Sequence, residues 1–137
     1  MSGTARILVV DDHLELLEFL RYTLRDRYAV ATAVGVQEAL KHLSDYSVNL
    51  VLLDFKMPEA NGVSALREIK TRYADIEVIL MTAYAPVDVI QEAFRLGAFA
   101  FLMKPFDIDN LINTIEEALR NQALSRTPNP GGIRRSV

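Results

Sequence analysis

The stretch Asn49-Leu50-Val51-Leu52-Leu53-Asp54 decides the fold class, because an uninterrupted aliphatic run ends there at a single carboxylate. Such a short continuous apolar run indicates a strand buried on both faces, which is typical of parallel sheets with helices on two sides. Ile7-Leu8-Val9-Val10 is a second run, ending at Asp11-Asp12, and the run from Ile76 to Met81 is a third, ending at Thr82. We therefore predict three buried parallel strands.

Helical periodicity fills the intervals between the strands. Two weaker strands are predicted at 28–33 and 99–103. Apolar residues spaced three and four apart follow each of the five strands, within 16–24, 36–43, 63–73, 89–94 and 108–119. Strict alternation with short links predicts one α/β domain, a doubly wound parallel sheet of five strands with five helices on its two faces.

Composition agrees with a globular domain of about this size. The chain has 137 residues, of which 50% are hydrophobic and 24% charged, and it has no cysteine, which excludes disulfides and thiolate zinc sites. We expect a folded domain over residues 4–124 and a flexible tail or linker over 125–137, where Pro and Gly gather without an apolar face.

Charge and hydropathy restrict the partners and the compartment that we expect for the protein. The formal net charge is −3, and the tail holds three arginines and no acid, so residues 1–124 are more acidic than the whole chain. An acidic body argues against direct nucleic-acid binding by residues 1–124. No apolar run approaches the ~20 residues that span a bilayer, and the start lacks a signal-peptide core, so we expect a cytoplasmic protein without membrane contact.

Polar side chains follow four of the five predicted strands. Asp11 and Asp12 end the first strand, Asp54 the third, Thr82 the fourth and Lys104 the fifth. Ligands of open parallel sheets bind beyond the carboxyl ends of the strands, so these groups should converge at one edge, with the second strand away from the centre. Clustered carboxylates recruit a cation, and oxygen ligands favour a hard ion, Mg²⁺ first and Mn²⁺ as a possible substitute.

A carboxylate cluster beside an amine and a hydroxyl suits phosphoryl transfer. That reaction depends on in-line positioning and on neutralising the phosphoryl oxygens, which a cation, Lys104 and Thr82 would supply. A carboxylate is a competent acceptor, and Asp54 is the natural candidate because it stands alone after a central strand. The adjacent Asp11 and Asp12 suit metal binding, whereas His13 is interpreted as structural or exposed.

Five motifs in order give the chain a specific resemblance. They are Val9-Val10-Asp11-Asp12, Leu52-Leu53-Asp54-Phe55-Lys56-Met57-Pro58, Gly62, Met81-Thr82-Ala83 and Lys104-Pro105-Phe106. Over roughly residues 4–122 this set resembles the receiver domain of two-component response regulators. It looks most like single-domain receivers of sporulation-type phosphorelays and receivers of nitrogen-regulator-type activators.

The resemblance implies a role for each matched residue. Asp54 would accept a phosphoryl group from a phosphohistidine. Asp12, Asp54 and the backbone carbonyl of Lys56 would bind Mg²⁺, with Asp11 binding through water. Thr82 would hydrogen-bond the phosphoryl group and move toward it, and Lys104 would pair with a phosphoryl oxygen.

The resemblance also implies a flavodoxin-like fold with strand order 2-1-3-4-5, a cis peptide between Lys104 and Pro105, and a switch aromatic at Phe101. As a Phe, residue 101 lacks the hydroxyl of a Tyr, so packing alone can bias its position. Lys56, Ala83 and Tyr84 are expected to modulate the site, and we hypothesise that Lys56 and Tyr84 shield the acyl phosphate from water.

These expectations describe a phosphoacceptor receiver that modifies itself and is an enzyme only in a loose sense. Its partners would be a histidine kinase or histidine phosphotransferase and a downstream effector or output domain, reached through the surface of the fourth helix, fifth strand and fifth helix. The alternative is a receiver cut from a DNA-binding transcriptional regulator.

Three further alternatives fit less well. A phosphatase with an Asp nucleophile needs a second Asp where Lys56 stands, and a flavodoxin needs a hydroxyl- and glycine-rich loop in place of Asp11 and Asp12. A receiver-like module that is never phosphorylated would not need the intact acidic set.

Overall fold

The five predicted strands form one parallel sheet in a computed structural model that describes residues 4–57 and 60–126. The sheet order is β2-β1-β3-β6-β7, so β2 lies at one edge and β3 at the centre, as expected. The strands are β1 (Arg6–Val10), β2 (Ala29–Ala33), β3 (Leu50–Asp54), β6 (Glu77–Thr82) and β7 (Ala100–Met103).

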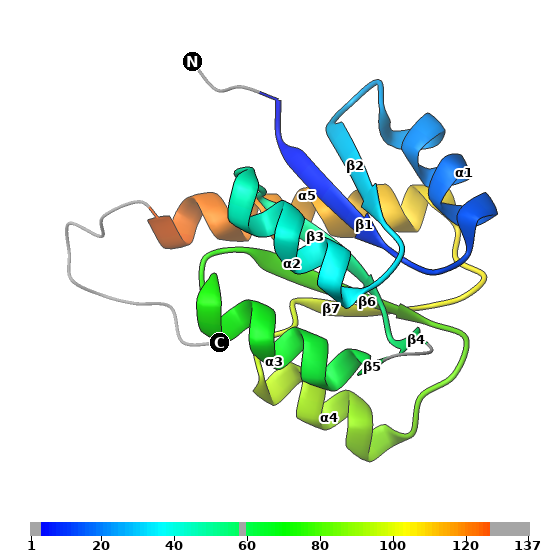
Figure 1. Cartoon of the computed structure of the whole chain (residues 1–137), viewed down its shortest axis with the longest axis vertical. Coiled ribbons are helices and arrows are strands. Elements are labelled where there is room, and N and C mark those ends of the chain that lie inside the picture. The colour runs from blue at the N-terminus through cyan, green and yellow to red at the C-terminus, as the bar shows by residue number, and fades with distance from the viewer. Residues whose placement is uncertain (1–3, 58–59, 127–137) are drawn as a thin grey trace.

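Helices cover both faces of this sheet (Figure 1). They are α1 (Leu14–Leu24), α2 (Val36–Asp45), α3 (Gly62–Arg72), α4 (Val87–Arg95) and α5 (Ile108–Arg126). One core packs buried side chains of α2, α3 and α4 against the sheet, and the other packs those of α1 and α5. The fold is therefore the doubly wound, flavodoxin-like α/β arrangement that the sequence predicts.

The central strand explains why this sheet is stable. All five residues of β3 are buried, and Leu50, Val51, Leu52 and Leu53 are each 0% exposed. Burying such a side chain contributes roughly 1.5–3 kcal/mol relative to leaving it in water. The strand therefore holds its last residue, Asp54, in a firmly packed frame.

A short hairpin that the sequence does not predict follows β3. Its strands β4 (Lys56–Met57) and β5 (Ala60–Asn61) pair antiparallel, with Lys56 opposite Asn61. Two-residue strands are too short to show a period-two pattern, which is why hydrophobic periodicity misses them. The hairpin, whose first strand β4 begins at Lys56, lies beside the carboxyl end of β3 (Figure 1).

Two local backbone features follow, of which the first agrees with what the resemblance implies. The Lys104–Pro105 peptide is cis, and Gly97, with φ of 109°, ends α4 in a conformation that L side chains rarely adopt. Among the described residues, no helix combines the length and the apolar character needed to cross a bilayer.

Polar side chains fasten α5 to the amino ends of two strands. The amide nitrogen of Gln122 donates to the carbonyls of Asn49 and Asp75, each at 2.8 Å, and Gln122 is only 5% exposed. Asn121 donates to the Glu77 carboxylate at 2.9 Å. The last turns of α5 therefore lie at the end of the sheet opposite Asp54 (Figure 1). The helix runs to Arg126, and residues 127–137, where most of the expected tail falls, lie outside the described residues.

Candidate functional site

The predicted side chains meet at the carboxyl edge of the sheet because the strands end nearly in step. Val10 pairs with Leu53, and Thr82 pairs with Met103. The side chains at or just after these pairs therefore share one edge of the sheet, here called the rim: Asp11, Asp12, Asp54, Thr82 and Lys104. Lys104 Nζ donates to Asp11 Oδ2 at 2.8 Å and to Asp54 Oδ1 at 3.0 Å. One ammonium group thus bridges carboxylates that are 43 positions apart in the chain.

Asp11 is the best satisfied of the acids. It is 0% exposed and accepts hydrogen bonds from Lys104, from the His13 backbone N–H at 2.9 Å and from His13 Nδ1 at 3.0 Å. Burial by itself would raise the pKa of Asp11, but the hydrogen bonds from Lys104 and His13 outweigh burial and lower that pKa. Asp11 is therefore a stably charged anchor for the Lys104 amine.

Asp54 lies in a less favourable environment for its charge. It is 4% exposed, and burial raises its pKa, with the negative charges of Asp11 and Asp12 adding to the rise and the Lys104 hydrogen bond opposing it. Burial would lower the pKa of Lys104, but its hydrogen bonds to Asp11 and Asp54 raise that pKa, so the amine is charged. Asp54 is thus an acid with a cation beside it and excess negative charge around it.

Asp12 offers a ligand atom that accepts no hydrogen bond from the described residues. Its Oδ1 atom is buried and forms no hydrogen bond within the described part of the chain, although His13 Nδ1 lies 3.5 Å away. Ligand atoms of Asp11, Asp12 and His13 all lie within 4.8 Å of one another. A buried, unpaired carboxylate oxygen next to a second carboxylate fits a hard divalent cation, which would satisfy the oxygen and offset the repulsion.

His13 lies closer to the site than the sequence indicates. Its side chain is 72% exposed, as expected, yet its ring hydrogen-bonds Asp11. That hydrogen bond and the charges of Asp11 and Asp12 raise the pKa of His13. Its position directly after the acidic pair is the signal that could have placed its ring there.

Thr82 reaches the rim, but its hydroxyl hydrogen is used elsewhere. Thr82 is 1% exposed, and its Oγ1 donates to the Tyr84 carbonyl at 2.9 Å and accepts from the Tyr84 N–H at 3.2 Å. No hydrogen bond joins Thr82 to Asp54 among the residues that the structure covers. Ala83, Tyr84 and Lys56 are exposed near the rim, and within the described residues none of them hydrogen-bonds Asp54.

Phe101 contacts an aromatic ring that the sequence analysis did not single out. Phe101 is partly buried, and its ring centroid lies 6.2 Å from that of Phe55, at an interplanar angle of 48°. Phe55 directly follows Asp54 and is 8% exposed. Its place in the chain, after the acceptor, was visible in the sequence, but its long-range contact with residue 101 was not.

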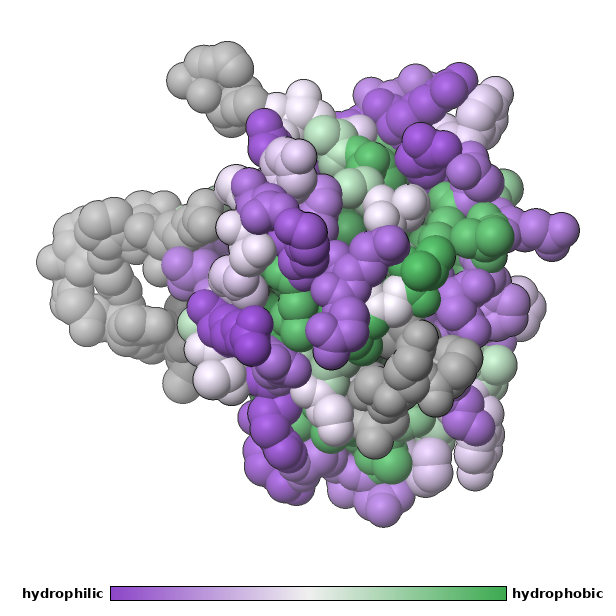
Figure 2. All heavy atoms as spheres, viewed as in Figure 1, coloured by the Kyte–Doolittle hydropathy of each residue, from purple (hydrophilic) through white to green (hydrophobic). Residues whose placement is uncertain are grey.

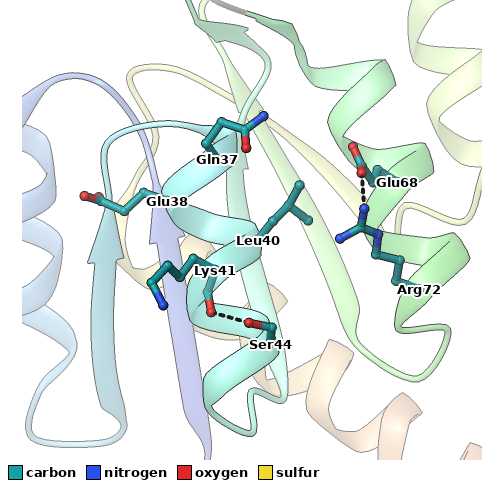
Figure 3. Close-up of a pocket in the computed structure, with 7 residues that line it drawn as sticks. All are labelled: Gln37, Glu38, Leu40, Lys41, Ser44, Glu68 and Arg72. Atoms are coloured by element: carbon teal, nitrogen blue, oxygen red, sulfur yellow. Dashed lines mark hydrogen bonds and ion pairs between the residues drawn. The ribbon is translucent and has the colours of Figure 1, made fainter.

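A separate hollow lies between α2 and α3 (Figure 3). Its lining is Gln37, Glu38, Leu40, Lys41, Ser44, Glu68 and Arg72. Glu68 and Arg72 form an ion pair of 2.7 Å across one turn of α3. Hydrophilic residues cover much of the face in view, with hydrophobic residues between them and in a group on the right (Figure 2). The lining of the hollow includes none of the clustered Asp and Lys side chains at the carboxyl edge of the sheet. We therefore take the rim, where those side chains meet, as the candidate site.

Comparison with known proteins indicates the same family that the sequence motifs resemble. The family model of the response regulator receiver domain matches residues 7–116. The transcriptional regulatory protein ZraR of Klebsiella oxytoca is 42% identical over 130 residues, which cover 93% of this chain and 29% of that protein. The chain therefore spans less than a third of this relative's length.

Solved structures agree in fold. A CheY-like receiver domain protein from Methanospirillum hungatei JF-1 matches with a TM-score of 0.86 and 29% identity, over 90% of this chain and 99% of that one. The beryllofluoride-activated NtrC4 receiver domain dimer matches with a TM-score of 0.81 and 33% identity, over 85% and 98%. Because the matched segment contains every rim residue described above, the chain belongs to the response regulator receiver domain family of two-component signalling.

Proposed function

We propose that this receiver domain takes a phosphoryl group onto Asp54 from a phosphohistidine of a histidine kinase or a histidine phosphotransferase. A carboxylate oxygen of Asp54 would attack phosphorus in line as the bond from phosphorus to the imidazole nitrogen breaks, and the imidazole keeps that electron pair. The observation that carries the proposal is the Lys104 ammonium held between Asp11 and Asp54 at a buried rim. This proximity of the amine to Asp54 supports a role for Lys104 in pairing with a phosphoryl oxygen.

The same rim fits Mg²⁺, with Mn²⁺ as a substitute. Asp11, Asp12, Asp54 and the backbone carbonyl of Lys56 would hold the ion. The buried Asp12 oxygen without a hydrogen bond, in a cluster with Asp11 and His13, supports a cation beside the acidic pair. When bound, the ion would neutralise charge on the phosphoryl oxygens. Asp11 keeps Lys104 oriented, and Lys104 keeps the approach to Asp54 electrostatically favourable.

The switch would begin with an exchange of partners at Thr82. Its hydroxyl would leave the Tyr84 carbonyl and donate to a phosphoryl oxygen, which pulls the loop after β6 toward Asp54. Phe101 would then repack, and the surface of α4, β7 and α5 would change. The phosphoryl group in this scheme shifts an equilibrium between two states that both exist beforehand.

Lys56, Ala83 and Tyr84 would modulate how long the acyl phosphate lasts. All three are exposed at the rim, and Tyr84 is 65% exposed. We propose that the side chains of Lys56 and Tyr84 cover the phosphoryl group and hinder attacking water.

The partners follow from the same reading. The receiver would occupy residues 4–124 in the cytoplasm, with 125–137 as a linker or tail and a downstream effector or output domain as its target. The match to a transcriptional regulator of which the chain covers 29% favours a second candidate, the receiver of a DNA-binding regulator. A reading frame that continues past Val137 into a DNA-binding module would decide for it.

The direct test is incubation with Mg²⁺ and acetyl phosphate, followed by intact mass measurement. We expect one added phosphoryl group in the wild type and in Asp45→Asn, a control in which an exposed acid of α2 is neutralised. Asp54→Asn and chelator should each abolish the addition. A mass increase that persists in Asp54→Asn, or that is absent from the wild type at saturating acetyl phosphate and Mg²⁺, would overturn the proposal.

A further inference from the structure

We infer that Phe55 is a positioning residue of the switch, which transmits the state of Asp54 to Phe101 by direct ring packing. The inference rests on the proposed function, because it assigns the route from the acceptor to β7. Phe55 connects two residues of the proposed switch, Asp54 and Phe101. It is bonded covalently to Asp54, and its ring is the neighbour of Phe101.

The backbone of Phe55 is held on both sides. Its N–H donates to the Met81 carbonyl at 2.8 Å, and its own carbonyl accepts the Gly62 N–H at 2.7 Å. Met81 directly precedes Thr82, so the first bond ties Phe55 to the strand whose end would move. The second bond ties it to the start of α3. Movement at either Asp54 or Thr82 therefore displaces Phe55.

The ring of Phe55 has little freedom toward α3. A Cβ at Gly62 would lie 2.7 Å from the Phe55 Cα and 2.9 Å from its ring Cδ1. The ring thus packs directly on the backbone of Gly62, with Phe101 as its aromatic neighbour. A displaced Phe55 ring is blocked at Gly62, and the described aromatic ring beside it is that of Phe101.

Phe55 is buried outside the two core clusters formed by the described residues. Its side chain is 8% exposed, yet it belongs to neither of the two core clusters, whereas Phe101 packs against the cluster of α2, α3 and α4. Phe101 has no hydroxyl with which to lock an inward position. Its place is set by packing, and Phe55 is the ring that packs on it.

Phe55→Leu is the primary test, because it removes the ring and keeps an apolar side chain. Phe55→Met, which conserves volume better, is the second variant in case the first lowers stability too far. Phe99→Leu is the matched control, since Phe99 packs against the core of α1 and α5 on the other side. Each protein is treated with acetyl phosphate for intact mass and, separately, with beryllofluoride and Mg²⁺ for amide chemical shifts of residues 87–103.

We expect every variant to take one phosphoryl group, which shows that the acceptor chemistry is intact. The beryllofluoride-induced shift changes at β7 and α4 should fall about threefold or more in both Phe55 variants and stay unchanged in Phe99→Leu. The double variant with Phe101→Leu should respond no less than Phe101→Leu alone, because contacting residues that act as a unit are not additive.

A normal β7 response in either Phe55 variant, or additive losses in the double variant, would overturn the inference while leaving Asp54 as acceptor. Loss of phosphorylation in the wild type would instead overturn the proposed function. The two failures are therefore distinguishable by the mass measurement alone.

Discussion

At the scale of single residues, Asp11 and Asp54 both accept a hydrogen bond from Lys104, yet their surroundings shift their pKa values in opposite directions. Asp11 has more hydrogen-bond donors than Asp54, so its pKa is lowered while that of Asp54 is raised. The sequence predicts both positions from the ends of strands. It does not predict the difference between them, which depends on burial and on donors such as the His13 N–H that only the folded chain brings together.

The two carboxylates should therefore affect stability with opposite signs. A raised folded-state pKa means that charged Asp54 destabilises the fold at neutral pH, and this cost disappears as pH falls through that pKa. The charge of Asp11 stabilises the fold above its unfolded pKa near 3.8, and this stabilisation is lost as pH falls through the lowered folded pKa.

In chelator at pH 7, Asp54→Asn should raise the free energy of unfolding by about 1 kcal/mol, and Asp11→Asn should lower it by about 3 kcal/mol, since a buried ion pair is broken. Urea unfolding of the three proteins measures both changes. Shifts of the same sign in the two variants would contradict this account of the rim.

Lys56 gives a second prediction at this scale. Lys56→Ala should shorten the lifetime of the acyl phosphate several-fold, because water gains access to the phosphoryl group. Loss of the added mass with time after removal of acetyl phosphate measures this lifetime. Lys41→Ala, which removes an exposed lysine of α2, is the control. An unchanged or longer lifetime in Lys56→Ala would count against shielding.

At the scale of elements, the junction between β3 and α3 is the part that sequence patterns describe least well. The alternation of strands and helices is visible in hydrophobic periodicity, because each element has an apolar face of fixed period. The β4–β5 hairpin is not, and neither is the contact of Gly62 with Phe55, which depends on a tight approach of two backbones. Such approaches have no periodic signature.

Gly62→Ala tests this junction. The added methyl group would lie 2.7 Å from the Phe55 Cα, so it must displace backbone, and we expect a loss of about 1–3 kcal/mol in the free energy of unfolding. Thr71→Ala, at an exposed position later in α3, should change it by less than about 0.5 kcal/mol. Equal stability of Gly62→Ala and wild type in urea would contradict the tight contact between Gly62 and Phe55.

At the scale of the whole molecule, folding brings together the carboxylates that the proposed cation would bind. The unfolded chain does not hold Asp11, Asp12 and Asp54 at one rim, so an ion that binds them favours the folded state. The sequence predicted this convergence correctly, because parallel strands share a carboxyl edge. It could not predict which carboxylate oxygen stays unpaired.

Mg²⁺ should accordingly stabilise the protein by about 2.7 kcal/mol at a concentration one hundred times its dissociation constant. Thermal unfolding with Mg²⁺, compared with NaCl of equal ionic strength, measures this gain. Asp12→Asn should remove most of it, because Asp12 carries the unpaired oxygen. Equal stabilisation of Asp12→Asn and wild type would place the ion elsewhere.

The hydrogen bonds of Gln122 at the amino ends of the strands determine how far the end of α5 lies from Asp54. The final turns of α5 are separated from Asp54 by the length of a five-residue strand, roughly 17 Å. The last described turns of α5 and the proposed acceptor Asp54 therefore lie at opposite ends of the sheet. If phosphorylation of Asp54 is to reach the end of α5, we expect it to do so through small relative shifts of the helices and strands between them.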